Sequence, residues 1–126
     1  MDRDQCSGKV TIPDGVTSIA EGAFENCSQI TEIAIPDSVN SIGSSAFFNC
    51  ATLKEIAIPE GVTSIDAVTF YGCYSLTSIS IPKSVTFIGE TVFCNCMNLS
   101  DVYYAGTPEQ WNAIAITGGN STDNYD

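Results

Sequence analysis

The side chains with the widest chemical repertoire in this 126-residue chain are its six cysteines. Four of them recur at one interval: Cys27, Cys50, Cys73 and Cys96. A zinc site needs roughly four ligands that converge on a point, whereas one thiol per repeating unit forms a line. Side chains in such a line are parallel, which disfavours the near-perpendicular dihedral angle of a disulfide. We therefore predict a structural ladder of buried thiols that act as small apolar side chains.

The other two cysteines, Cys6 and Cys94, lie outside this ladder. Cys94 and Cys96 form a C-x-C pair, which is a weak indication of metal or redox chemistry because no basic residue lies nearby to favour a reactive thiolate. The chain has no histidine, which excludes Ser-His-Asp and Cys-His catalysis and any histidine-ligated metal. We expect a protein that is not an enzyme and that uses no metal or cofactor.

The charge balance narrows the possible partners. The chain has 4 Lys and Arg residues against 15 Asp and Glu residues, and its formal net charge is −11. Nucleic acids and anionic lipids attract clustered cations, so we expect neither as a partner. No apolar run approaches the roughly 18–20 residues that cross a bilayer, so we expect no membrane insertion by this segment. The polar residues 1–5 lack the apolar stretch of a signal peptide.

A repeat organises the whole sequence. The dipeptide Ile-Pro recurs with a step of 23 residues, and seven apolar positions, one of them that of the ladder cysteines, keep this register through four units. Each unit alternates apolar and small residues before its proline, which is the pattern of a strand that the proline ends. Strands are expected at Val10–Ile12, Ile33–Ile35, Ile56–Ile58, Ile79–Ile81 and Val102–Tyr104. Second, shorter extended pieces are expected at Ser18–Ile19, Ser41–Ile42, Ser64–Ile65 and Phe87–Ile88. One unit cannot bury its own apolar side, so the units must stack into a solenoid.

This pattern resembles the BspA-like, treponemal-type leucine-rich repeat of 23 residues. The segments Ile30–Pro36 and Ala46-Phe47-Phe48-Asn49-Cys50 match it closely, while Thr69 and Val92 replace the alanine that precedes phenylalanine. The resemblance implies an α/β repeat solenoid: a right-handed superhelix of strand and loop, with a parallel sheet on its concave face and short irregular or helical returns. It also implies a cell-surface or secreted protein, of bacterial type, used for adhesion and protein contacts, with no enzymatic activity.

The repeat also predicts the domain organisation. We expect an irregular lead-in at residues 1–9, the leucine-rich repeat solenoid at 10–104, a C-terminal capping helix segment at 105–119 and a mobile polar tail at 120–126. Thr107, Pro108 and Gln110 have the types and spacing of a helix start with a capping box. Trp111, Ile114 and Ala115 are then expected to face the last coil, and Gly118-Gly119 to end the helix. We expect the chain to be a repeat domain of a larger protein.

Acidic residues recur as well, and they allow two interpretations. Glu32, Glu55 and Asp101 share one position of the repeat. Such a row could meet a basic partner or a calcium ion, or it could be a solvated face. Calcium needs about six to eight oxygens on a curved loop. Coils about 4.8 Å apart do not supply that geometry, so a solvated face is favoured.

Two surfaces are candidates for binding. The outward positions of the predicted sheet vary between otherwise regular units: Glu32, Lys54, Glu55, Ser78, Ser80, Asp101 and Tyr103. A second, apolar patch is expected on the return segments: Phe48, Tyr71 and Tyr74. Aromatic residues are enriched at protein interfaces, although local packing would explain this patch equally well.

These observations favour a non-catalytic, adhesin-like module that binds a host or cell-surface protein. The alternative is a structural spacer, or a repeat segment that associates with itself through its open solenoid ends.

Overall fold

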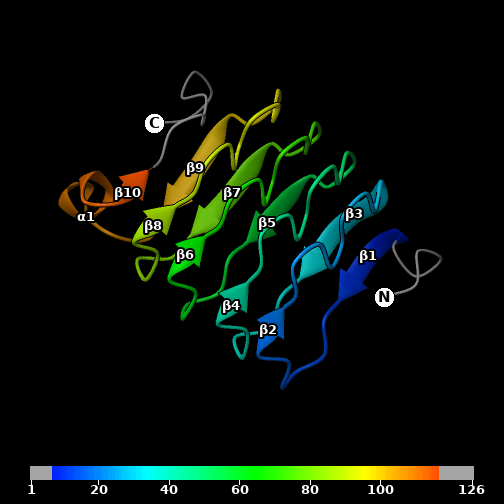
Figure 1. The fold of residues 1–126 in the computed structure, drawn as a ribbon, viewed down its shortest axis with the longest axis horizontal. Coiled ribbons are helices and arrows are strands. Elements are labelled where there is room, and N and C mark those ends of the chain that lie inside the picture. Colours follow the sequence, from blue (N-terminus) through cyan, green and yellow to red (C-terminus); the bar gives the residue numbers. More distant parts are fainter. Residues whose placement is uncertain (1–6, 117–126) are drawn as a thin grey trace.

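The computed structural model describes residues 7–116. It is a parallel β-solenoid of about four turns, made mostly of strand and loop, as predicted. The expected tail at 120–126 lies outside the described residues, as do Gly118, Gly119 and Cys6. Figure 1 shows the chain winding in successive coils from β1 to β9, each coil lying beside the one before it.

One side of the solenoid is a five-stranded parallel sheet in the order β1-β3-β5-β7-β9. Its strands are β1 (Ser7–Thr11), β3 (Gln29–Ala34), β5 (Glu55–Ala57), β7 (Ser78–Ile81) and β9 (Asp101–Tyr104). All five predicted strands are confirmed, with differences at their ends. The largest differences are at β1 and β3, which begin at Ser7 and Gln29. These two strands start earlier than predicted because their first residues also pair, across a shift of register between Gly8 and Lys9.

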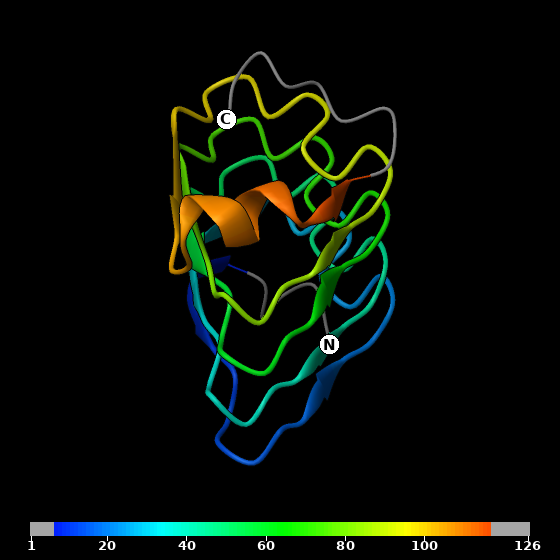
Figure 2. The ribbon, with the colours of Figure 1, turned by 90° about the vertical axis from the view of Figure 1, so that its left-hand side faces the viewer.

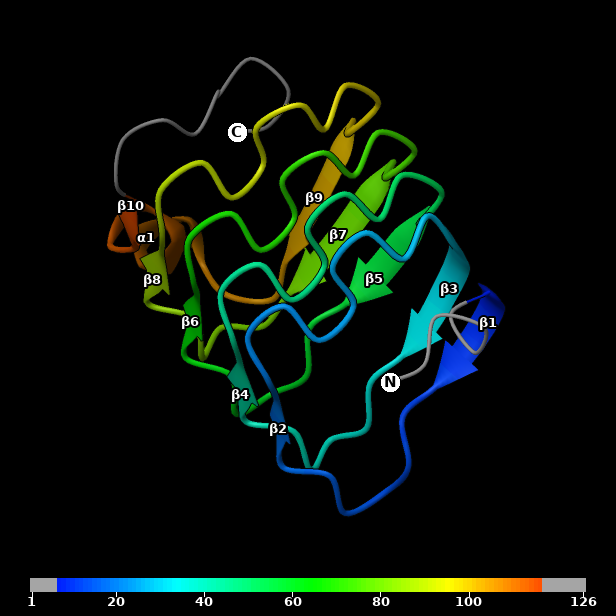
Figure 3. The ribbon, with the colours of Figure 1, turned by 45° about the vertical axis from the view of Figure 1, so that its right-hand side comes forward.

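A second row of short strands lies across the core from the first sheet, as Figure 3 shows. It consists of β2 (Ser18–Ile19), β4 (Ser41–Ile42), β6 (Ser64–Ile65), β8 (Phe87–Ile88) and β10 (Ala115–Ile116). This row is interrupted: β2 pairs with β4, and β6, β8 and β10 form a separate sheet. The four predicted short pieces are therefore confirmed, and β10 was not foreseen.

Close approach of the backbone explains where this second row is continuous. A Cβ on Gly43 would lie 2.5 Å from the amide nitrogen of Glu21 in the previous coil, and one on Gly89 would lie 2.7 Å from that of Ala67. Both glycines donate a backbone hydrogen bond to the previous coil. The equivalent position between them is Asp66, which carries a Cβ, and the row is interrupted at this coil.

The core consists of identical side chains stacked coil upon coil. Phe24, Phe47, Phe70 and Phe93 form one such stack, with ring centroids 5.4–6.1 Å apart and planes within 3° of parallel. All four rings are buried, as are the isoleucines and leucines that share the core positions of the repeat. Burial of each such side chain contributes about 1.5–3 kcal/mol, so the core grows with every coil that is added.

Each return segment contains two residues in the left-handed backbone conformation. One precedes the ladder cysteine and is Asn26, Asn49, Gly72 or Asn95; the other is Gly22, Ser45, Val68 or Thr91. Glycine and asparagine tolerate this conformation, whereas a β-branched residue such as Val68, at φ 52°, is strained there.

A single short helix, α1 (Pro108–Asn112), follows the last coil within the described residues. Thr107 is its N-cap and forms the predicted capping box with Gln110. Figure 2 shows α1 crossing the end of the solenoid from the side of β9 to the side of β8. Ile114 is buried and Trp111 packs against the core, as expected.

The predicted end of this helix at Gly118-Gly119 is wrong. α1 ends at Asn112, and Ala115 is exposed in β10 instead of facing the last coil. The physical reason is that the chain leaves the helix to pair β10 with β8, which extends the second row of strands by one member.

The contact at Gly43 can be tested by mutation. Gly43→Ala forces a Cβ onto the backbone of the previous coil, and we expect it to lower the free energy of unfolding by about 2 kcal/mol. Ala20→Gly, at the equivalent position of the first coil, is the control and changes it by less than about 1 kcal/mol. Denaturant unfolding measures both, and equal stability of Gly43→Ala and the parent would contradict the proposed contact.

The strain at Val68 leads to the opposite expectation. Val68→Gly relieves a left-handed β-branched residue and should raise the free energy of unfolding by about 0.5 kcal/mol or more. The reciprocal change, Gly22→Val at the equivalent position, should lower it. Thermal melting followed by circular dichroism compares the two, and a lower melting temperature for Val68→Gly would disprove the strain.

Candidate functional site

The outer face of the five-stranded sheet carries two parallel rows of side chains. Strand alternation turns Ile33, Ile56 and Ile79 into the core and their neighbours outward. The first outward row, here called the charged row, is Lys9, Glu32, Glu55, Ser78 and Asp101. The second, here called the small row, is Thr11, Ala34, Ala57, Ser80 and Tyr103.

A hollow of about 340 Å³ lies over this face. Its base is formed by small residues, among them Ala34, Ala57 and Ser80, and Tyr103 lies at one side of it. Of the outward residues named from the sequence, five line the hollow: Glu32, Glu55, Ser78, Ser80 and Tyr103.

The other two predicted sheet-face residues do not line the hollow. Lys54 directly precedes β5 and so lies outside the strand alternation. Asp101 is on the edge strand β9, where its carboxylate accepts a hydrogen bond from the hydroxyl of Ser100 at 3.1 Å. Sequence variation between the repeat units indicated the whole outward face as a candidate site. It could not show that Lys54 and Asp101 lie outside the hollow.

The charges around the hollow are unbalanced. Lys9 Nζ lies 3.9 Å from Glu32 Oε2, and this is the one ion pair within residues 7–116. Glu32 and Glu55 are direct partners across β3 and β5. Two like charges at such positions destabilise a sheet slightly. A cation placed between them would remove this repulsion.

A second hollow, of about 310 Å³, adjoins the first. The two share Ser80 and Tyr103, so the ring of Tyr103 stands between them with 59% of the residue exposed. The second hollow is more apolar, since Ile58, Ile81 and Pro82 line it, although Glu60 is also part of its wall. The repeat pattern did not predict it, because the loop after each strand was interpreted only as a turn.

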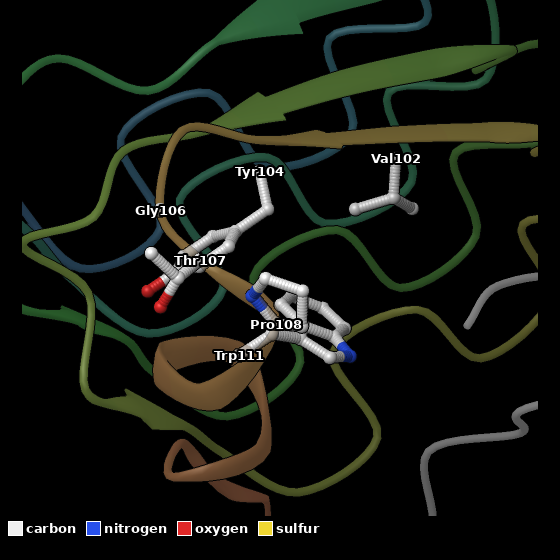
Figure 4. A pocket seen from close by; sticks show the side chains of 6 residues that line it. All are labelled: Val102, Tyr104, Gly106, Thr107, Pro108 and Trp111. Carbon is white, nitrogen blue, oxygen red and sulfur yellow. The ribbon is translucent and has the colours of Figure 1, made fainter.

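A third hollow, of about 220 Å³, lies between the last strand and the helix, and Figure 4 shows its lining. Pro108 and Trp111 of α1 face the end of β9, where Tyr104 lies with its ring 5.3 Å from that of Trp111. The sequence predicted the contact of Trp111 with the last coil, but it did not predict a hollow beside that side chain.

The comparisons with known proteins agree with this architecture. The family model described as the BspA type leucine rich repeat region matches residues 4–119 in 6 copies. The chain belongs to the BspA-type leucine-rich repeat family. No curated protein matches it at a significant level.

Several solved structures resemble this BspA-type chain. A leucine-rich cell surface protein from Faecalibacterium prausnitzii is 39% identical with a TM-score of 0.68, over 88% of this chain and 35% of that one. A leucine-rich repeat protein of T. pallidum is 32% identical with a TM-score of 0.72, over 80% of this chain and 53% of that one. A third, from Bacteroides ovatus, is 32% identical with a TM-score of 0.70, over 77% and 36%. The chain therefore spans about a third to a half of these structures.

The cysteine ladder of this leucine-rich repeat lies inside the solenoid. Cys27 is 5% exposed and the other three ladder cysteines are fully buried. The thiol of Cys50 donates a hydrogen bond to the carbonyl of Phe24 at 3.2 Å. In the next two coils, Cys73 and Cys96 donate in the same way to the carbonyls of Phe47 and Phe70. The ladder thus also satisfies backbone carbonyls in the core, a role that the interpretation of these thiols as small apolar groups missed.

The protonation of Cys73 follows from this geometry. A hydrogen bond with Cys96, together with burial, raises the pKa of the Cys73 thiol. That thiol therefore stays protonated, remains a hydrogen-bond donor and is a poor nucleophile. The C-x-C pair does not converge: Cys96 is buried, whereas Cys94 is half-buried near the surface. Across residues 7–116, no cluster of three metal-ligating side chains is present.

The predicted apolar patch is only partly assembled. The rings of Phe48 and Tyr71 stack 5.1 Å apart and are half-buried, and Tyr71 Oη accepts a hydrogen bond from Asn95. Tyr74 is 44% exposed and lies outside this stack. In the part of the chain that the structure covers, no helix is long and apolar enough to cross a bilayer.

Substitutions at Cys50 test the ladder. Cys50→Asp buries a charge with no counterion and should lower the free energy of unfolding by about 3 kcal/mol or more. Cys50→Ala removes only a thiol and its hydrogen bond and should cost about 1–2 kcal/mol. Cys94→Ala, outside the ladder, should change it by less than about 0.5 kcal/mol. Denaturant unfolding measures all three, and parent-like stability of Cys50→Asp would refute the ladder.

Proposed function

We propose that this chain is a non-catalytic protein-binding module of a surface or secreted protein, and that it presents the outer face of its five-stranded sheet to an adhesion partner. The observation that carries the proposal is the 340 Å³ hollow, which has a base of small residues and a largely exposed Tyr103 beside it. Exposed aromatic residues beside a concave surface are typical of protein-binding sites.

Three further observations support the proposal. Leucine-rich repeats generally mediate protein interactions, and the chain belongs to such a family. One of the similar structures is described as a cell surface protein. The outward residues of the sheet also vary along each row, from Lys9 to Asp101 and from Thr11 to Tyr103, while the core residues are repeated. The fold itself does not require this variation.

Retention experiments with matched variants test the proposal. In the sheet-face variant, Glu32, Glu55, Ser80 and Tyr103 are changed to alanine. In the control variant, Asp14, Asp37, Ser18 and Tyr74 are changed to alanine, which removes four residues of matching character from other surfaces. Parent and variants are immobilised, and extracellular-matrix and cell-surface extracts are passed over them. We expect a protein that is retained by the parent and the control and lost from the sheet-face variant.

All three proteins should melt at nearly the same temperature, because the altered side chains are exposed and lie outside the core. Equal retention by the sheet-face variant would show that another surface binds. Loss only from the control variant would move the site towards Tyr74. No retention by any of them would favour the alternative of a structural spacer.

A further inference from the structure

We infer that the two adjoining hollows form one groove for an extended peptide segment of the partner, with a basic side chain between Glu32 and Glu55 and an aliphatic side chain in the second hollow, beside Tyr103. This inference rests on the proposed function and names the chemistry of the partner. The two hollows are joined because both include Ser80 and Tyr103.

The shape of the groove favours a single extended segment. Ala34, Ala57 and Ser80 form its base, and such small side chains let a peptide backbone lie close to the sheet. The first hollow spans three strands, which are about 4.8 Å apart, and an extended chain rises about 3.3 Å per residue. Roughly four residues of peptide therefore cross it before they reach Tyr103.

The charges select a basic residue at one end of this groove. Glu32 and Glu55 are direct cross-strand partners, and Lys9, which pairs with Glu32 at 3.9 Å, lies on the side of Glu32 away from Glu55. Glu55 faces the uncharged Ser78 on its other side. An arginine or lysine of the partner, placed between the two carboxylates, relieves their repulsion and gains two opposite charges. An acidic segment would be repelled, both here and by the net charge of −11.

Tyr103 and the second hollow define the other end. Tyr103 offers an exposed ring face at the junction, against which a basic stem or an aliphatic group can pack. Beside it, at the ends of β5 and β7, Ile58, Ile81 and Pro82 provide an apolar wall. A peptide that places a basic residue first and an aliphatic residue a few positions away would use both hollows at once.

Selection from a displayed library of random linear dodecapeptides tests this inference, with the whole chain immobilised. We expect enrichment of peptides that combine arginine or lysine with a nearby leucine, isoleucine or valine. The most enriched peptide is then synthesised together with an analogue in which citrulline, which has nearly the shape of arginine but no charge, replaces the basic residue. The affinities are measured by fluorescence polarisation.

The expected effects are about tenfold weaker binding for the citrulline analogue, for the double variant Glu32→Gln and Glu55→Gln, and for Tyr103→Ala. The matched control is the double variant Asp14→Asn and Asp37→Asn. It also removes two negative charges, but from another exposed row of the repeat, and should leave the affinity within about twofold. Binding should also weaken as the salt concentration is raised.

Three results would overturn the inference. Enrichment of neutral or acidic peptides would do so, and so would equal affinity of the parent and the Glu32/Glu55 double variant. The third is no enrichment at all. If the partner retained on the sheet face persists in any of these cases, the proposed function stands and only the groove is refuted. If retention on the sheet face is also absent, both fail.

Discussion

The structure depends on one constraint, which is that each coil must accept a copy of itself at the spacing of a hydrogen-bonded sheet. Backbone bonds such as those from Phe24 N to Ala46 O and from Phe47 N to Thr69 O hold successive coils in register. At that spacing, a side chain lies directly on its equivalent in the next coil. Phenylalanine rings therefore stack, and each ladder thiol from Cys50 on reaches a phenylalanine carbonyl of the previous coil. The left-handed residue before each ladder cysteine recurs because every coil follows the same backbone path.

The same constraint creates the candidate site. Register brings the glutamates of two coils side by side and lines up small residues beside them, so a face that is plain in one coil becomes a groove over three. Tyr103 breaks the small row at its last member and provides the one large side chain there. Regular stacking thus provides the small base of the groove and its pair of carboxylates, and Tyr103, which departs from the small row, provides its aromatic side chain.

Most of the fold could be predicted from the sequence, because residues that lie 23 positions apart must stack in one row of a solenoid with that period. The strands, the short second row and the capping box at Thr107 all follow from local pattern. Features that depend on contacts between distant elements do not. The pairing of β10 with β8 ended the helix early, and the ladder thiols donate hydrogen bonds to carbonyls of the preceding coil. Lys54 lies one position before β5, so the alternation that assigned it to the sheet face does not reach it.

The interruption of the second row of strands at Asp66 distinguishes one junction between coils from the others. Between the second and third coils the short strands do not pair, whereas the main sheet continues through the pair Glu32 and Glu55 and the bond from Lys54 N to Thr31 O. The return segments remain bonded there, from Ser45 to Ala67 and from Asn49 to Tyr71. The rings of Phe47 and Phe70 also stack across this junction. A partner seated between Glu32 and Glu55 would therefore bridge the two coils whose short strands do not pair, and would add a link between them that the second row lacks.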